Sequence, residues 1–215
     1  MPRNSAGFIG GVAALAALCW LLGGPVAAHP HVWISVQTAL LYDKGAFSGL
    51  RHTWAFDQFY TAMAIEGLDK NKDGKYDREE LAELAKVNID GLKEFVYFTT
   101  VSVAGQEVKL EAPSDYWLEY NGSVLSLHFT LPFAEPIPPE TKGLMFAVQD
   151  PTFFIAFDLA KVDPAKLGPG APPACKIRVG ASKEQASALN DAFAKQLGAA
   201  AVGGSQAISV DCQGP

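Results

Sequence analysis

Short segments of alternating hydrophobicity, separated by turn-forming residues, recur along most of this chain and limit it to folds built largely from β-strands. Apolar and polar positions alternate in residues 32–42 and again in residues 50–56, with a turn at 43–45, which predicts a β-hairpin. Further extended segments are expected at 96–104, 107–111, 115–120, 124–131, 143–150 and 153–160. Asn121-Gly122 predicts a second hairpin, whereas Pro132 and residues 136–139 predict a connecting loop.

The hydrophobic period becomes helical between residues 58 and 95. Residues 58–68 place Phe59 and Met63 on one helical face, and residues 79–95 carry apolar residues at helical spacing. A polar loop of twelve residues separates the two segments. We therefore predict an α+β protein, a mainly antiparallel β-sandwich over residues 29–162 with a helix–loop–helix insertion at 58–95.

The C-terminal part of the chain has a different composition. Residues 163–173 are rich in proline and glycine and predict a long loop. Residues 174–215 are expected to form a small strand–helix–strand appendix, with a capping-box pattern at Ser182 and Gln185. Cys175 and Cys212 fall in its two strands and are expected to form a disulfide in an oxidising compartment; two thiolate metal ligands are the alternative.

The first 28 residues have the pattern of a signal peptide. Arg3 precedes an apolar run at residues 8–22, and small residues end the segment at Ala28. Cleavage after Ala28 predicts a periplasmic protein, residues 29–215, without direct membrane insertion; an uncleaved anchor is the alternative. The formal net charge of −6 and the lack of basic clusters argue against nucleic acid or anionic membranes as partners.

Residues 69–80 match the twelve-residue calcium-binding loop of EF-hand proteins. Calcium prefers six to eight oxygen ligands, and acidic or amide side chains occupy the alternating positions that supply them. The predicted ligands are the side chains of Asp69, Asn71, Asp73, Asp77 and Glu80 and the backbone carbonyl of Lys75. Because only one such loop occurs, we expect the calcium site to stabilise the inserted helices. A loop that caps a helix without metal is the alternative.

The histidines suggest a second kind of metal site. His29 and His31 would lie at the processed amino terminus, where two imidazoles suit zinc, nickel or copper. Asp57, His128 and Asp150 are candidates to complete this site, although each carboxylate is equally suited to a cap or turn. His128 is expected on an exposed strand face. His52 shares an apolar strand face and is expected to be a core residue.

No nucleophile elbow, zinc-protease helix or phosphate-binding glycine loop occurs, so we predict that the protein is not an enzyme. Two alternatives to a metal-binding accessory protein stay open. One is a copper redox protein that uses an amino-terminal histidine brace. The other is a calcium-stabilised structural or interaction sandwich without a cargo.

Several segments, in the same order, resemble a bacterial family catalogued as domain of unknown function 1007. They are His-Pro-His-Val-Trp-Ile at 29–34, Thr-Trp-Ala-Phe-Asp-Gln-Phe-Tyr at 53–60, the calcium-like loop, Asp115-Tyr116, and Asp-Pro-Thr-Phe-Phe-Ile-Ala-Phe at 150–157. The resemblance implies the periplasmic component of an ABC-type or nickel/cobalt-permease-associated transport system. It also implies zinc, nickel or cobalt as cargo and an inner-membrane metal permease as partner. The sequence lacks the histidine-rich loop of many zinc carriers.

Overall fold

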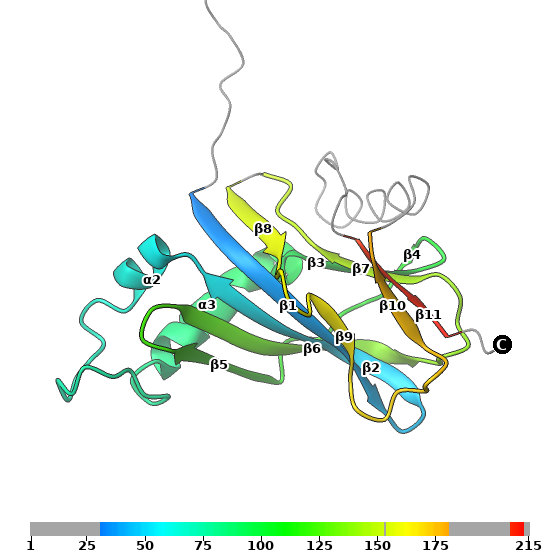
Figure 1. Ribbon diagram of the computed structural model, residues 1–215, viewed down its shortest axis with the longest axis horizontal. Helices are drawn as coiled ribbons and strands as arrows, with labels where there is room; N and C mark the ends of the chain where they lie inside the picture. The colour runs from blue at the N-terminus through cyan, green and yellow to red at the C-terminus, as the bar shows by residue number, and fades with distance from the viewer. Residues whose placement is uncertain (1–30, 153, 181–206, 213–215) are drawn as a thin grey trace, which may run out of the picture.

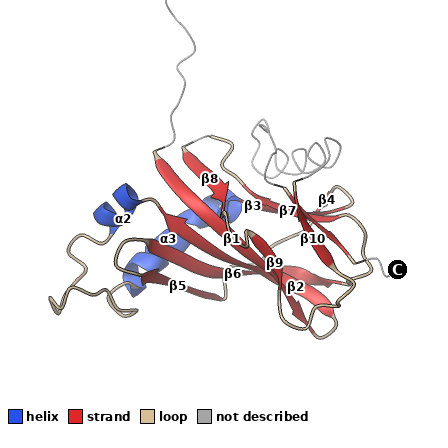
Figure 2. Ribbon diagram, viewed as in Figure 1, coloured by secondary structure: helices blue, strands red, loops and turns tan. Residues whose placement is uncertain are grey.

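Two β-sheets pack face to face and two short helices lie at one end of them, as shown by a computed structural model that describes residues 31–152, 154–180 and 207–212 (Figures 1 and 2). The strands are β1 (Val32–Asp43), β2 (Ala46–Phe56), β3 (Thr99–Val103), β4 (Gln106–Glu107), β5 (Asp115–Tyr120), β6 (Leu125–Ile137), β7 (Leu144–Val148), β8 (Ile155–Leu159), β9 (Ala165–Leu167), β10 (Lys176–Val179) and β11 (Ile208–Asp211). The helices are α2 (Gln58–Ala64), α3 (Ala82–Leu92) and the irregular 3-10 segment η1 (Lys93–Phe98). This mainly β arrangement agrees with the predicted α+β sandwich.

The first sheet has the order β5-β6-β2-β1-β8, and β9 also pairs with β1. The predicted hairpins are confirmed, because β1 pairs antiparallel with β2 and β5 pairs antiparallel with β6. The pairing of β1 with β8 and β9 is parallel, which the sequence pattern did not indicate. The second sheet has the order β10-β11-β7-β3-β4.

Strand β6 continues to Ile137, so the predicted loop is wrong at Pro132 and at residues 136–137, whereas residues 138–139 lie beyond the strand. Pro132 cannot donate a ladder hydrogen bond, and the pairing of β6 with β2 shifts register next to it, between Phe47 and Gly49. A Cβ atom on Gly49 would lie 2.5 Å from the carbonyl oxygen of Leu131. Glycine at this position therefore permits the close approach of the two strands.

The C-terminal strands belong to the second sheet. β10 pairs with β11, and β11 pairs with β7. The disulfide between Cys175 and Cys212 is present as predicted. The predicted helix around Ser182 and Gln185 lies outside the described residues, as do the signal segment and His29.

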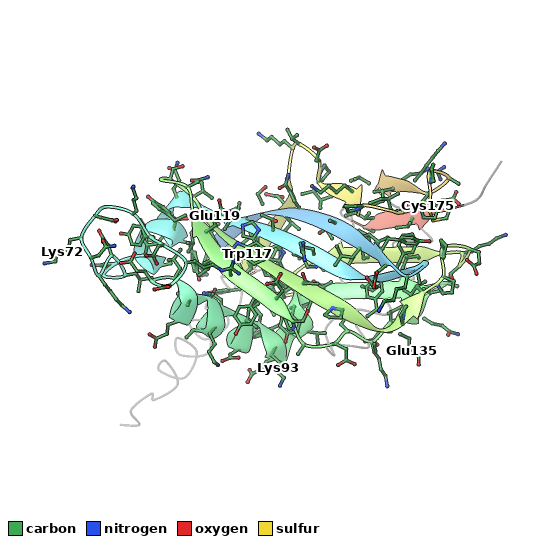
Figure 3. The ribbon with its side chains drawn as sticks, turned by 90° about the horizontal axis from the view of Figure 1, so that it is seen from below. Lys72, Lys93, Trp117, Glu119, Glu135 and Cys175 are labelled. Carbon is green, nitrogen blue, oxygen red and sulfur yellow. A yellow bond between two sulfur atoms is a disulfide. The ribbon has the colours of Figure 1, made fainter. Side chains whose placement is uncertain are left out.

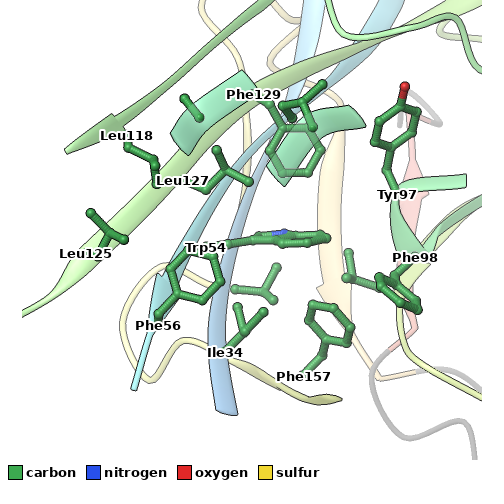
Figure 4. Packing of buried hydrophobic residues seen from close by; sticks show 14 of the residues in the cluster. Ile34, Trp54, Phe56, Tyr97, Phe98, Leu118, Leu125, Leu127, Phe129 and Phe157 are labelled. Atoms are coloured by element: carbon green, nitrogen blue, oxygen red, sulfur yellow. The ribbon is translucent and has the colours of Figure 1, made fainter. Parts of the chain in front are cut away.

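Two apolar clusters fill the space between the sheets. In the first, the ring of Trp54 meets Phe129 and Phe157 edge-on, each at 4.9 Å between centroids (Figure 4). Leu81, Ala85 and Ile89 bring the inserted helices into this cluster. The insertion is thus packed on the core and does not hang free from it.

His52 is a fully buried polar residue between the two sheets. Its Nδ1 lies 2.9 Å from Thr38 Oγ1 in the same sheet, and its Nε2 lies 3.4 Å from Thr99 Oγ1 in the opposite sheet. Burial lowers the pKa of His52 to about 3. The prediction of a hydrogen-bonded core histidine is confirmed.

Candidate metal-binding sites

The loop 69–80 joins the two helices and is bent by its own side chains. Asp69 accepts hydrogen bonds from the backbone N–H groups of Asp73 (3.2 Å) and Gly74 (3.0 Å). Asn71 accepts from Asp73 and Asp73 accepts from Lys75, each at 2.8 Å. Gly74 has φ +76°, a conformation that favours glycine. Three of the predicted ligands therefore curl the chain around one side of the loop.

Glu80 connects the end of the loop to its beginning. Its Oε1 accepts from the N–H groups of Lys70 (2.9 Å) and Asn71 (3.3 Å), and its Oε2 accepts from Asp77 (3.2 Å). The side chain is buried, with 8% exposed. The twelfth position of a calcium loop must lie beside the first residues of that loop, and Glu80 does so.

The carboxylates do not converge on one point in this conformation. Among the described residues, no group of three or more His, Cys, Asp or Glu side chains is arranged to hold a metal ion. The chemistry of the donors suits calcium, since all are oxygens. Calcium binding requires Glu80 to exchange backbone N–H partners for the ion.

The second half of the loop is fixed to β5 by aromatic contacts. Tyr76 meets Tyr120 edge-on at 5.1 Å, and the guanidinium carbon of Arg78 lies 4.8 Å from the ring centre of Trp117. In Figure 3, Trp117 lies on the strand face and the loop with Lys72 extends beyond the strand end. The sequence pattern did not identify these contacts, because they join residues about forty positions apart.

His31, the second predicted transition-metal ligand, is held at the start of β1. Its backbone N–H donates to the carbonyl of Phe154 (2.9 Å), and its ring lies 5.0 Å from the Phe154 ring. The residue is exposed. Its imidazole is therefore accessible to a metal ion, and the remaining partner from the amino terminus, His29, lies outside the described residues.

Asp57 and Asp150 have structural partners. Asp57 caps α2 by accepting from the N–H of Tyr60, and it also accepts from the N–H of Trp33, both at 2.9 Å. Asp150 accepts from the backbone and hydroxyl of Thr152 and from the N–H of Ile155 (2.9 Å). The sequence suited each carboxylate either to a metal site or to a cap or turn. In the structure, Asp57 caps a helix and Asp150 stabilises a turn. Both hold the chain around His31.

His128 is not brought to His31. His128 lies at the level of Gln37 in the sheet, because Gln37 pairs with Thr53 and Thr53 pairs with His128. Gln37 is six positions from His31 along β1, which is about 20 Å of extended chain. A single site cannot include both histidines.

His128 has its own partners on the outer face of the first sheet. Its ring stacks on Trp117 at 4.6 Å, so its side chain is only 16% exposed and the expected open position is wrong. Nδ1 lies 3.1 Å from Thr53 Oγ1, and Nε2 lies 3.2 Å from a Glu119 oxygen, without hydrogen-bond alignment. Burial lowers the pKa of His128, and the Glu119 carboxylate opposes this. Figure 3 shows Glu119 and Trp117 on neighbouring parts of this face.

Comparisons with known proteins place the chain among uncharacterised relatives. The pattern of a family described as protein of unknown function (DUF1007) matches residues 14–209. An uncharacterised protein of Haemophilus influenzae is 25% identical over 136 residues, and the match covers 63% of this chain and 65% of the relative. An uncharacterised 15.5 kDa protein in the trpE 3' region of Spirochaeta aurantia is 28% identical over 99 residues, or 46% of this chain and 70% of the relative.

Two observations bear on the compartment. No helix within the described ranges is long and apolar enough to cross a bilayer. The disulfide is compatible with an oxidising compartment such as the periplasm.

Proposed function

This chain belongs to the family of proteins of unknown function DUF1007, and from that premise we propose that it is a periplasmic, calcium-stabilised accessory protein of a transition-metal transport system. The observation that carries the metal-binding part is the closure of the loop 69–80 by Glu80. Its carboxylate lies against the first turn of the loop, where a twelfth-position ligand has to be. Asp69, Asn71, Asp73 and Asp77 and the carbonyl of Lys75 would supply the other oxygens.

Calcium in this loop has a structural role in the proposal. On one side, the apolar residues of α3 connect the loop to the core. On the other side, Tyr76 and Arg78 contact Tyr120 and Trp117 of β5. An ion in the loop would therefore hold the inserted helices against the first sheet. The protein itself performs no catalysis in this proposal.

Calcium is expected to raise the melting temperature of the chelator-treated protein. At ten times the dissociation constant, binding to the native state contributes about 1.4 kcal/mol, or about 3–6 °C for a chain of this size. Glu80→Gln should remove this shift, because it deletes the carboxylate that closes the loop. Differential scanning calorimetry with and without calcium measures both effects.

Glu79→Gln is the matched control for this experiment. It removes the same charge at the adjacent, exposed position and should retain the calcium shift. If calcium leaves the melting temperature of the wild-type protein unchanged, or shifts Glu80→Gln equally, the loop is not the calcium site.

The transport part of the proposal depends on the amino terminus. His31 is exposed and held in place by Phe154, and the hydrogen bonds of Asp57 and Asp150 brace this end. His29 and His31 together would bind zinc, nickel or copper, for delivery to an inner-membrane permease. This binding surface is separate from the calcium loop.

Protein that begins at His29 is expected to bind zinc, nickel or copper with a dissociation constant below about 1 μM, near −8 kcal/mol, in calorimetric titrations. His31→Ala should weaken binding at least about tenfold, because it removes one of two imidazoles. His128→Ala is the control and should leave the affinity unchanged, since His128 lies about 20 Å or more away. Absence of binding by the wild type would leave a calcium-stabilised structural sandwich.

A further inference from the structure

Four large apolar side chains are exposed where the chain enters β1. They are Trp33 (48% exposed), Phe59 (71%), Met63 (57%) and Phe154 (55%), and we refer to them as the apolar end. In Figure 1, β1 and β8 begin side by side and α2 lies next to the start of β1. Half of the large exposed apolar side chains of the described residues thus gather at one end of the molecule.

Hydrogen bonds and a ring contact link the segments that carry the four side chains. Trp33 and Asp57 exchange hydrogen bonds, and Asp57 caps the helix that carries Phe59 and Met63. On the other side of Trp33, two residues earlier in the chain, His31 contacts Phe154 through its ring and its N–H group. The segments that carry the apolar end are therefore neighbours around the beginning of β1.

Helix α2, with the sequence Gln-Phe-Tyr-Thr-Ala-Met-Ala, contains no charged residue. Its inner side is used by Thr61, which is buried and accepts a hydrogen bond from the N–H of Leu125, and by Tyr60, which stacks on Phe56. Phe59 and Met63 are thus apolar side chains on the helix face that does not contact the core, where a free surface helix normally carries charge.

We propose that the apolar end rests on the interfacial region of a lipid bilayer. The argument is the chain that precedes β1. The apolar run at residues 8–22 is followed by only eight residues, 23–30, which span at most about 28 Å. Whenever that run lies in a membrane, β1 therefore begins within about 28 Å of the membrane surface. The apolar end surrounds the beginning of β1.

The side chains match that environment. Tryptophan and other aromatic rings are enriched at the level of lipid head groups, and methionine adapts to irregular apolar contacts. The formal net charge of −6 disfavours anionic lipids, so the expected surface is zwitterionic. Binding would be unaffected by salt, since it depends on apolar contacts. The inference does not require metal binding, although it would place His31 at the membrane surface.

The test is flotation with phosphatidylcholine vesicles in the absence of metals. Both the full chain and the chain processed after Ala28 are expected to float with the vesicles, and the processed chain should do so equally at low and high salt. Trp33→Ser combined with Phe59→Ser should reduce vesicle partitioning of the processed chain at least about tenfold, the loss of about 1.4 kcal/mol. Val87→Ser combined with Val179→Ser, which removes exposed apolar residues elsewhere, should change it less than twofold.

Quenching of tryptophan fluorescence by brominated phosphatidylcholine gives an independent readout that needs no destabilising change. In the chain processed after Ala28, which lacks Trp20, Trp54 is buried and Trp117 contacts Arg78 and His128, so Trp33 should account for the quenching, and Trp33→Phe should lose it. If the full chain floats with the vesicles and the processed chain does not, residues 1–28 are the only anchor, which overturns the proposal. So would equal losses in the two double variants, or self-association through the apolar end without vesicle binding.

Discussion

Acidification from pH 7 to pH 5 is expected to reduce the free energy of unfolding by about 2 kcal/mol through His52 alone. The pKa of this histidine falls from 6.5 in the unfolded chain to about 3 in the core, so the unfolded state takes up a proton in this pH range and the native state does not. Each pH unit in the window between the two pKa values costs about 1.4 kcal/mol. The stabilising effect is complete above pH 6.5 and is lost as the pH falls towards 3. Urea unfolding at the two pH values measures it.

Substitution variants separate His52 from other titrating groups. Between pH 7 and pH 5, the free energy of unfolding of His52→Gln should fall by about 2 kcal/mol less than that of the wild type, because glutamine takes up no proton. His128→Gln should retain most of the wild-type loss, since His52 still titrates. If His52→Gln and the wild type lose the same amount, His52 does not govern acid sensitivity.

Reduction of the disulfide is expected to lower the free energy of unfolding by about 4 kcal/mol. Cys175 and Cys212 are 37 positions apart, and releasing a loop of this length returns that much conformational entropy to the unfolded chain. The bond also joins residues flanking β10 and β11, at the edge of the second sheet. Guanidinium unfolding with and without reductant should show a lower midpoint in the reduced protein.

The control is the double variant Cys175→Ser, Cys212→Ser. Its unfolding midpoint should match that of the reduced wild type and should not respond to reductant. A reductant effect on the double variant would mean that the loss arises elsewhere, and an unchanged wild-type midpoint would contradict the expected stabilisation.

Local patterns predicted the local parts of the fold. The alternation on both sides of residues 43–45 predicted β1 and β2, and the change to a helical period predicted α2 and α3, although α3 begins later than expected. Strand β3 begins at Thr99 and not at residue 96, because Val96, Tyr97 and Phe98 adopt positive φ values. Such conformations are not visible in a hydrophobic pattern.

Pairings between distant segments were not predictable in this way. Alternation indicates which face of a strand is buried but not which neighbour the strand has, so the parallel partners of β1 and the joining of β11 to β7 were missed. The continuation of β6 past Pro132 depends on Gly49, more than eighty positions earlier in the chain.

In the candidate sites, too, local features could be predicted from the sequence and long-range contacts could not. The twelve-residue spacing predicted calcium ligands in the loop 69–80, and the same side chains make the local hydrogen bonds that bend it; their role as ligands stays a prediction. The contacts of His128 with Trp117, Glu119 and Thr53 could not be predicted, since they depend on the pairing of three strands. Asp57 precedes a helix by one residue, a position that suited a cap and a metal ligand equally, and the structure shows the cap.

The parallel pairing of β1 affects the order in which the chain can fold. Val32–Val36 pair with Ile155–Leu159, more than 120 positions away, so one edge of the first strand has no partner until most of the polypeptide has emerged. The hairpin with β2 can form early, but its open edge then resembles the exposed edges on which chains aggregate. Such long-range closure slows folding. The chain therefore depends on protection of that edge until β8 arrives.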